Sequence, residues 1–98
     1  MSNLQGYTCY ERALQLFGHL KQAAKCQEEL NQLGIELSRF ITEDNRFDRK
    51  KVLEEITDVE IMLKQLKIMF NFTEDDLLEM KTLKVAKLEL FLQNSENK

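Results

Sequence analysis

The feature that most constrains the fold of this chain is its lack of proline, together with only three glycines in 98 residues. Sandwiches and barrels need a turn about every 8 to 12 residues, and those turns are usually built from Gly, Pro and Asn. Long stretches of this sequence contain neither Gly nor Pro, which argues against an all-β fold. A chain of this length supports one hydrophobic core. We therefore expect a single all-α domain over residues 1–98.

The first half of the chain has apolar residues at helical spacing from Ala13 onward, interrupted by Gly18 and His19. This pattern predicts two helices, or one bent helix, with the second segment over residues 20–41. Positions three or four apart lie on one helix face. The residues expected to face the core from the second segment are Leu20, Ala23, Ala24, Leu30, Leu33, Leu37 and Phe40.

Two further helices are predicted in the second half. The fourth helix should follow Thr73, whose hydroxyl suits an N-cap position, and end near Leu92. The polar ends, residues 1–8 and 93–98, are expected to be frayed. The fold class is thus all-α, a bundle of four to five helices. The third helix should extend over about residues 48–70 and bury Val52, Ile56, Val59, Met62, Leu63, Leu66 and Met69.

Charge and hydropathy exclude several classes of protein. With 14 Lys and Arg against 17 Asp and Glu, the net charge is −3, so there is no basic field to attract nucleic acid. No apolar run approaches the roughly 18 residues of a membrane span, and the first residues do not resemble a signal peptide. We expect a cytoplasmic protein that contacts neither nucleic acid nor membrane. Cys9 and Cys26 fit no zinc or disulfide pattern and are expected to be reduced packing residues.

Acidic side chains occur at the spacing that places them on one helix face. Glu29, Gln32 and Glu36 form one polar row, and Glu55 with Asp58 forms another. If the two helices pack antiparallel, these rows point oxygen ligands at one place, and hard cations such as Mg²⁺ prefer oxygen ligands. The same spacing is also common on solvated helix faces, so a surface role stays open.

The residues around these rows resemble a known family. Residues 29–32 and 55–58 are similar to the ExxE and ExxD half-motifs of the MazG-like all-α nucleoside triphosphate pyrophosphohydrolases. The flanking sequences EELNQL and EEITDVEIMLKQLKIMF resemble the short, single-domain phage type over about residues 10–90. The resemblance implies Mg²⁺-dependent hydrolysis of an NTP or dNTP to its monophosphate and pyrophosphate, with Mn²⁺ as a substitute ion. It also implies a bacterial or phage-infected host cell.

Carried over residue by residue, the resemblance makes Glu29, Glu55 and Asp58 metal ligands, with Glu29 and Glu55 as catalytic carboxylates. Gln32 occupies the position of the second family glutamate and is the fourth metal ligand in this alignment. A glutamine offers a neutral carbonyl oxygen in place of a carboxylate, so we expect weaker metal binding. Glu36, one turn further on, compensates if the helix presents it toward the site.

A basic row on the fourth predicted helix offers phosphate contacts. Lys84 and Lys87 fall where the family often has a basic residue near the site, and they are the expected substrate phosphate-binding residues. A solvated face paired with Glu79 and Glu89 is the alternative. The resemblance also implies a homodimer or homotetramer in which helices of two subunits complete the bundle.

Two other functions remain open. One is a catalytically weak or inactive relative that serves as a nucleotide-binding or assembly module, which the substitution at Gln32 favours. The other is a helical interaction protein whose acidic rows are only surface. Metal binding separates an enzyme from the second of these alternatives.

Overall fold

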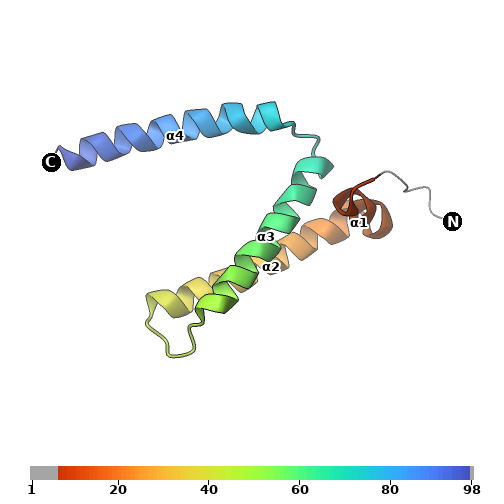
Figure 1. Cartoon of the computed structure of the whole chain (residues 1–98), viewed down its shortest axis with the longest axis horizontal. Coiled ribbons are helices and arrows are strands. Elements are labelled where there is room, and N and C mark those ends of the chain that lie inside the picture. Colours follow the sequence, from red (N-terminus) through yellow and green to blue (C-terminus); the bar gives the residue numbers. More distant parts are fainter. Residues whose placement is uncertain (1–6, 98) are drawn as a thin grey trace.

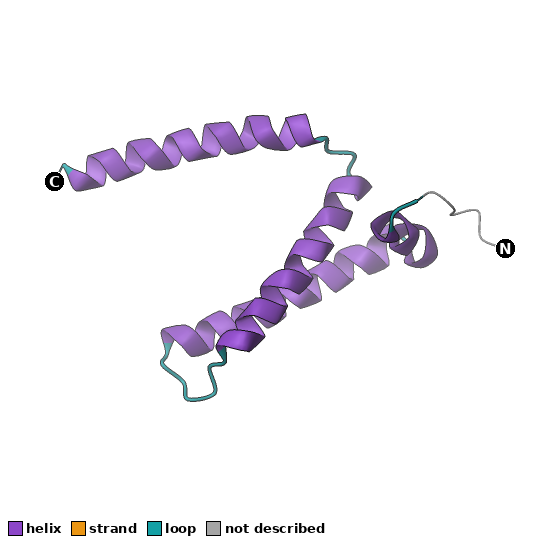
Figure 2. Cartoon of the chain, viewed as in Figure 1, coloured by secondary structure: helices purple, strands orange, loops and turns teal. Residues whose placement is uncertain are grey.

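The computed structural model of the chain describes residues 7–97 and is entirely helical over that range, with no strand (Figures 1 and 2). Its four helices are α1 (Cys9–Phe17), α2 (His19–Ile41), α3 (Arg49–Met69) and α4 (Glu74–Glu96). The predicted all-α bundle is confirmed. None of the helices in this described part combines the length and apolar character that crossing a membrane requires.

Local capping explains where the helices begin. The Thr8 hydroxyl accepts a hydrogen bond from the Glu11 amide, and the Glu11 carboxylate accepts one from the Thr8 amide, which forms a capping box ahead of α1. Thr73 and Asp76 form the same arrangement ahead of α4, so the predicted Thr73 N-cap is confirmed. Asp48 caps α3 through the Lys50 amide.

Breaks between helices occur at residues with a left-handed backbone. Gly18 has φ 88°, a conformation that favours glycine, and it separates α1 from α2. The first half therefore contains two helices and not one bent helix. Asn71, with φ 60°, follows the end of α3, and Asn is one of the few other residues that adopt this conformation readily.

Two predicted ends differ from the structure. The first helix begins at Cys9, before the apolar pattern starts, because Thr8 caps it. The prediction that residues 93–98 are frayed is wrong for 93–96, since α4 continues to Glu96. No glycine or proline interrupts this polar stretch. The expectations for residues 1–6 and 98 lie outside the described residues.

The central pair of the fold is α2 and α3, which are joined by residues 42–48 and lie side by side in antiparallel orientation (Figure 1). The short helix α1 packs against both of them. In contrast, α4 extends away from the pair and packs on none of the other helices (Figure 1).

The surface of α2 that faces α3 is largely polar, contrary to the predicted apolar stripe. Residues at steps of three and four face the partner helix, but Leu20 of the predicted stripe is 89% exposed and Phe40 is 61% exposed. Ala23 and Leu33 of the stripe are partly buried, and the row that is covered is offset around the helix from the rest of the stripe. It consists of the buried residues Gln22, Cys26 and Glu36 and the partly buried residues Glu29 and Leu33.

On α3 the prediction is partly confirmed. Val59 and Met62 are buried, whereas Ile56 and Leu63 remain exposed. The packing role predicted for Cys26 is also confirmed, and burial raises the pKa of its thiol. Cys9 is exposed on the first turn of α1, so the packing prediction is wrong for that residue.

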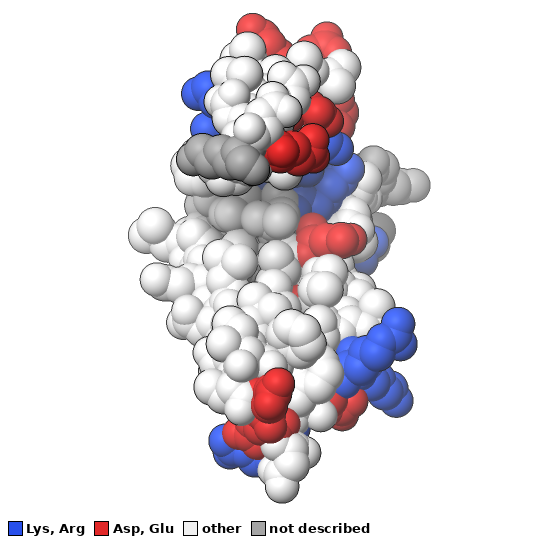
Figure 3. Space-filling view, turned by 90° about the vertical axis from the view of Figure 1, so that its left-hand side faces the viewer, with Lys and Arg blue, Asp and Glu red and all other residues white. Residues whose placement is uncertain are grey.

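Much apolar surface stays uncovered. Figure 3 shows a face on which uncharged side chains form a broad area between groups of charged residues. No residue of α4 is buried, so most of its apolar side chains stay in contact with solvent. The large apolar side chains exposed on α4 are Leu78, Met80, Leu83, Val85, Leu88, Leu90, Phe91 and Leu92.

Candidate metal centre

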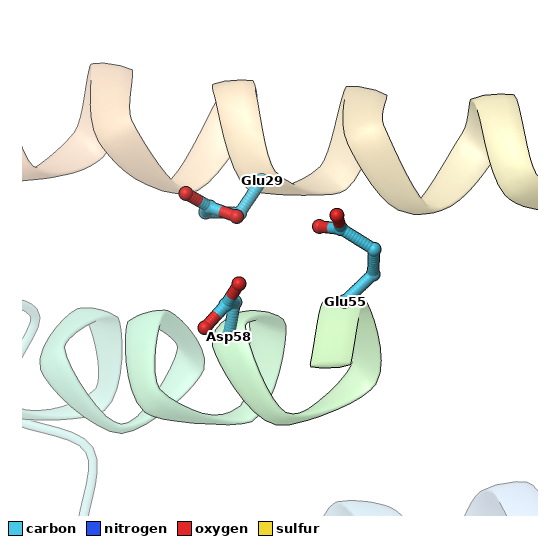
Figure 4. A group of neighbouring side chains, drawn as sticks. All are labelled: Glu29, Glu55 and Asp58. Carbon is cyan, nitrogen blue, oxygen red and sulfur yellow. The ribbon is translucent and has the colours of Figure 1, made fainter. Parts of the chain in front are cut away.

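Three carboxylates from two helices converge between α2 and α3. Glu29 projects from α2, while Glu55 and Asp58 project from α3 toward it (Figure 4). One carboxylate oxygen of each residue lies within 4.8 Å of the others. The convergence follows from helix geometry, because residues three apart on α3 share a face and the antiparallel partner presents Glu29 opposite them. The predicted meeting of these three residues is therefore observed.

Glu55 is the buried member of this group. It is 7% exposed, and its Oε2 is buried without a hydrogen-bond partner. Loss of hydration raises the pKa of this carboxyl, and the negative charges of Glu29 and Asp58 raise it further, against a smaller opposing effect of Lys51. Such a group gains stability from a proton or from a cation placed among the three carboxylates.

Cationic side chains flank the cluster. Lys25 Nζ lies 3.2 Å from Glu29 Oε1 and 3.6 Å from Glu28 Oε1. The hydrogen bond to Glu29 is the main reason that the pKa of Lys25 is raised. Farther along α2, Arg39 Nη1 donates to Glu36 Oε1 at 2.7 Å.

Gln32 and the flanking glutamates are exposed. Gln32 is exposed on α2, as are Glu28 beside Glu29 and Glu54 beside Glu55. The glutamates thus lie on the surface, next to the buried face and not within it. The buried acidic residue on this part of α2 is Glu36, at 2% exposure.

The two lysines predicted to bind phosphate lie elsewhere in the chain. Lys84 and Lys87 are exposed on α4, and α4 packs on no other helix. Within one chain the structure therefore does not bring either lysine to the carboxylates. Neither lysine forms an ion pair within the described part of the chain.

An open groove begins beside the carboxylates at Lys25. Phe17 and Met62 provide its apolar walls, and Lys21 Nζ lies 5.2 Å from the centre of the Phe17 ring. Gln22, which also lines the groove, donates from Nε2 to Gln65 Oε1 at 2.7 Å across the two helices. The volume of the groove is about 490 Å³. Lys25 lines the groove and also forms an ion pair with Glu29, so this residue connects the groove with the carboxylates.

Sequence reasoning did not anticipate the Gln22–Gln65 hydrogen bond or the Glu36–Arg39 ion pair. The spacing of the covered residues on α2 could have predicted that these polar side chains face α3. The covered residues follow one another at steps of four, three, four and three, as apolar core positions usually do, although several are polar. They are Gln22, Cys26, Glu29, Leu33 and Glu36.

No protein-family model, no curated protein and no solved structure matches this chain. What the site can do therefore follows from its own chemistry. Three carboxylates within 4.8 Å of one another, one of them shielded from water, offer the hard oxygen ligands that Mg²⁺ and Mn²⁺ prefer.

Proposed function

We propose that the chain is a Mg²⁺-dependent nucleoside triphosphate pyrophosphohydrolase that converts an NTP or dNTP into its monophosphate and pyrophosphate. The observation that carries the proposal is the convergence of Glu29, Glu55 and Asp58 on one point between two helices. These are the residues that the MazG-like half-motifs assign to the metal. A buried carboxylate without a partner, at Glu55, adds a physical reason for a cation at that point.

In this proposal the protein supplies ligands and a base. Glu29, Glu55 and Asp58 hold the cation, which polarises the phosphate and lowers the pKa of water when bound. A water molecule attacks the α-phosphorus, and the bond to the β-phosphate oxygen breaks to release pyrophosphate. Glu29 or Glu55 would accept the proton of that water.

The groove beside Lys25 is suited to the nucleoside. Its Phe17 ring and Met62 side chain offer apolar contact to a base, and the Gln22 side chain offers polar contact at the same wall. The ammonium of Lys25, next to Glu29, lies between this groove and the carboxylates. A nucleotide bound with its base in the groove would therefore direct its phosphates toward the proposed metal centre.

We propose that the working form is a homodimer or homotetramer. The exposed apolar side chains of α4 require a partner surface, and a second copy of the chain provides one of the same composition. In such an assembly α4 of one copy can bring Lys84 and Lys87 to the phosphates bound by another copy. This arrangement retains the phosphate-binding role of the two lysines.

The test is release of pyrophosphate from a panel of NTPs and dNTPs, with and without Mg²⁺. We expect release only with the cation, and we expect Glu55→Gln to reduce the rate at least about 100-fold, because it removes a ligand charge. Glu54→Gln is the matched control, since it makes the same change at the exposed neighbour. A Glu55→Gln variant as active as Glu54→Gln contradicts the proposal.

A second function is favoured by the exposed apolar surface and by the neutral Gln32. It is a catalytically weak or inactive helical protein that binds nucleotides or builds an assembly. Binding of Mg²⁺ and nucleotide without pyrophosphate release identifies this function. A chain that binds neither is a helical interaction protein.

A further inference from the structure

Glu36 is an acidic residue in a position where an apolar one is expected. It lies on the face of α2 that packs against α3 and is 2% exposed, as little as Cys26. Its Oε1 accepts the hydrogen bond from Arg39, whereas its Oε2 is buried and has no partner. Among the described residues only Glu55 has a carboxylate oxygen in the same condition.

The two unpartnered oxygens belong to one neighbourhood. Glu36 on α2 and Glu55 on α3 are both buried where the two helices pack against each other. Glu36 is not one of the three residues whose oxygens lie within 4.8 Å of one another, so it lies at the edge of that group. An ionised oxygen buried without a hydrogen bond is costly, and two such oxygens near each other are more so. A cation between the helices would offset both penalties if the Glu36 side chain turns toward it.

The charges around the cluster fit a divalent ion. When ionised, Glu29, Glu36, Glu55 and Asp58 carry four negative charges. Direct ion pairs with Lys25 and Arg39 balance two of them. Lys51 also acts on Glu55 with a positive charge but forms no ion pair with it. The excess negative charge that remains would be offset by a divalent cation.

We propose that Glu36, and not Gln32, is the fourth acidic residue of the divalent-cation site, together with Glu29, Glu55 and Asp58. Glu36 follows Glu29 by seven residues, about two helical turns, so both lie on the face of α2 that meets α3. Gln32 is neutral and exposed. The inference rests on the metal centre of the proposed function but not on its reaction.

The experiment measures Mg²⁺ binding to the full chain by calorimetry, and Mn²⁺ binding by electron paramagnetic resonance. Glu36→Gln keeps the size of the side chain and an oxygen for Arg39 but removes the charge. We expect it to weaken binding of both ions about 10- to 100-fold. Two controls on the same helix, Glu28→Gln and Gln32→Ala, change exposed side chains. They should stay within about twofold of the parent.

Thermal melts in chelator separate metal binding from folding. Because Glu36→Gln removes a buried charge, it should melt at or above the temperature of the parent without metal and gain less from added Mg²⁺. If it does not fold, Glu36→Asp serves as the second variant. It keeps the charge but withdraws the oxygens by one methylene, and it should also weaken binding.

Three results overturn the inference: equal Mg²⁺ affinity of Glu36→Gln and the parent, a greater loss in Gln32→Ala than in Glu36→Gln, or no binding of either ion by the parent at millimolar concentration. The last result also removes the metal centre of the proposed function. A parent that binds Mg²⁺ through Glu36 but releases no pyrophosphate from any nucleotide contradicts the proposed reaction and leaves the inference supported.

Discussion

The α2–α3 interface and helix α4 distribute polar and apolar residues in opposite ways. Between α2 and α3 the structure buries Gln22, Gln65, Glu36 and Glu55. On α4 it buries nothing, although nearly every second residue there is apolar. Folding normally covers apolar surface and leaves charges in water. One chain of this protein therefore buries polar side chains between α2 and α3 and exposes apolar side chains on α4.

The two regions also differ in how much they stabilise one chain. The polar interface contributes little hydrophobic stabilisation, because over residues 7–97 the buried apolar core consists only of Leu14, Cys26, Val59 and Met62. The exposed apolar side chains of α4 are a source of stability that one chain does not use, since burying a Leu contributes about 1.5–3 kcal/mol. Association with a second copy would use that stability while the polar interface is kept for binding.

The largest expected effect concerns association through α4. We expect the parent to sediment as a dimer or tetramer of the 11.6 kDa chain. Leu83→Asp, which places a charge among the exposed apolar side chains of α4, should weaken self-association about 100-fold or more, because a buried unpaired charge costs several kcal/mol. Thr82→Asp adds the same charge at the adjacent polar position and should have a much smaller effect.

Sedimentation equilibrium at micromolar protein measures both variants. A parent mass near 11.6 kDa at that concentration contradicts self-association. Equal dissociation in Leu83→Asp and Thr82→Asp places the contact on another surface.

The next effect concerns Glu55 and pH in the absence of metal. Its raised pKa means that the folded chain binds its proton more tightly than the unfolded chain. In chelator, stability should therefore rise as the pH falls through the raised folded pKa of this carboxyl toward its unfolded value. Glu29, Asp58 and Glu36 face this carboxyl with negative charge, and Lys51 opposes them.

Thermal melts of the parent, Glu55→Gln and Glu54→Gln in chelator measure this contribution. Glu55→Gln should lack this gain in stability as the pH falls, and Glu54→Gln should keep it. At still lower pH, stability should fall in all three proteins, because hydrogen bonds lower the pKa values of other carboxyls, which then protonate at a cost. These are Glu11 and Asp76, and Asp44, whose pKa the Arg46 side chain lowers to about 2.

The helices were predictable from local signals. The Thr73 cap, the break at Gly18 and the polar turn after residue 41 depend on neighbouring residues only, so the sequence contains them directly. The covered face of α2 was not predicted, since apolar spacing pointed to the side that carries Leu20 and Phe40. Which side of a helix is covered depends on the elements that pack against it. A large apolar side can stay exposed in one chain and be covered only when another chain binds.

The candidate site shows the same limit. Spacing placed Glu55 and Asp58 on one face of α3, and the antiparallel arrangement brought Glu29 to them. Glu36 was named only as a residue that compensates for Gln32, because its burial depends on the angle at which α2 packs on α3. The positions of Lys84 and Lys87 relative to the carboxylates depend on how α4 packs, and no other helix of the same chain covers it.

A smaller effect is expected from Gln32→Glu. The side chain at position 32 is exposed, so a new charge there is partly screened by water and salt. We expect Mg²⁺ affinity to rise by less than about fivefold, with slightly lower stability in chelator, since a like charge near the cluster acts weakly through solvent. Calorimetry and melts test this, with Asn31→Asp as the exposed control. A gain larger than the loss seen in Glu36→Gln would return position 32 to the metal centre.

The smallest expected effect is on nucleotide affinity, and it depends on contact between α4 of one copy and the α2–α3 carboxylates of another. If α4 of one copy lies across the carboxylates of another, Lys84→Ala and Lys87→Ala should each weaken nucleotide binding about twofold or threefold, as exposed charge contacts usually do. Lys64→Ala, on an exposed position of α3, should change nothing. Helix content should be unchanged in all three variants, because all three side chains are exposed.

The decisive form of this measurement combines each lysine variant with Leu83→Asp. In the dissociated background α4 has no carboxylates to cover, so Lys84→Ala and Lys87→Ala should lose their effect on nucleotide affinity. The energies of the lysine and leucine changes are then not additive, which is the signature of residues that act through one contact. Additive energies, with the lysine effect intact in the dissociated chain, require α4 to fold back onto its own α2–α3 pair. Unchanged affinity in every lysine variant returns both residues to a solvated helix face.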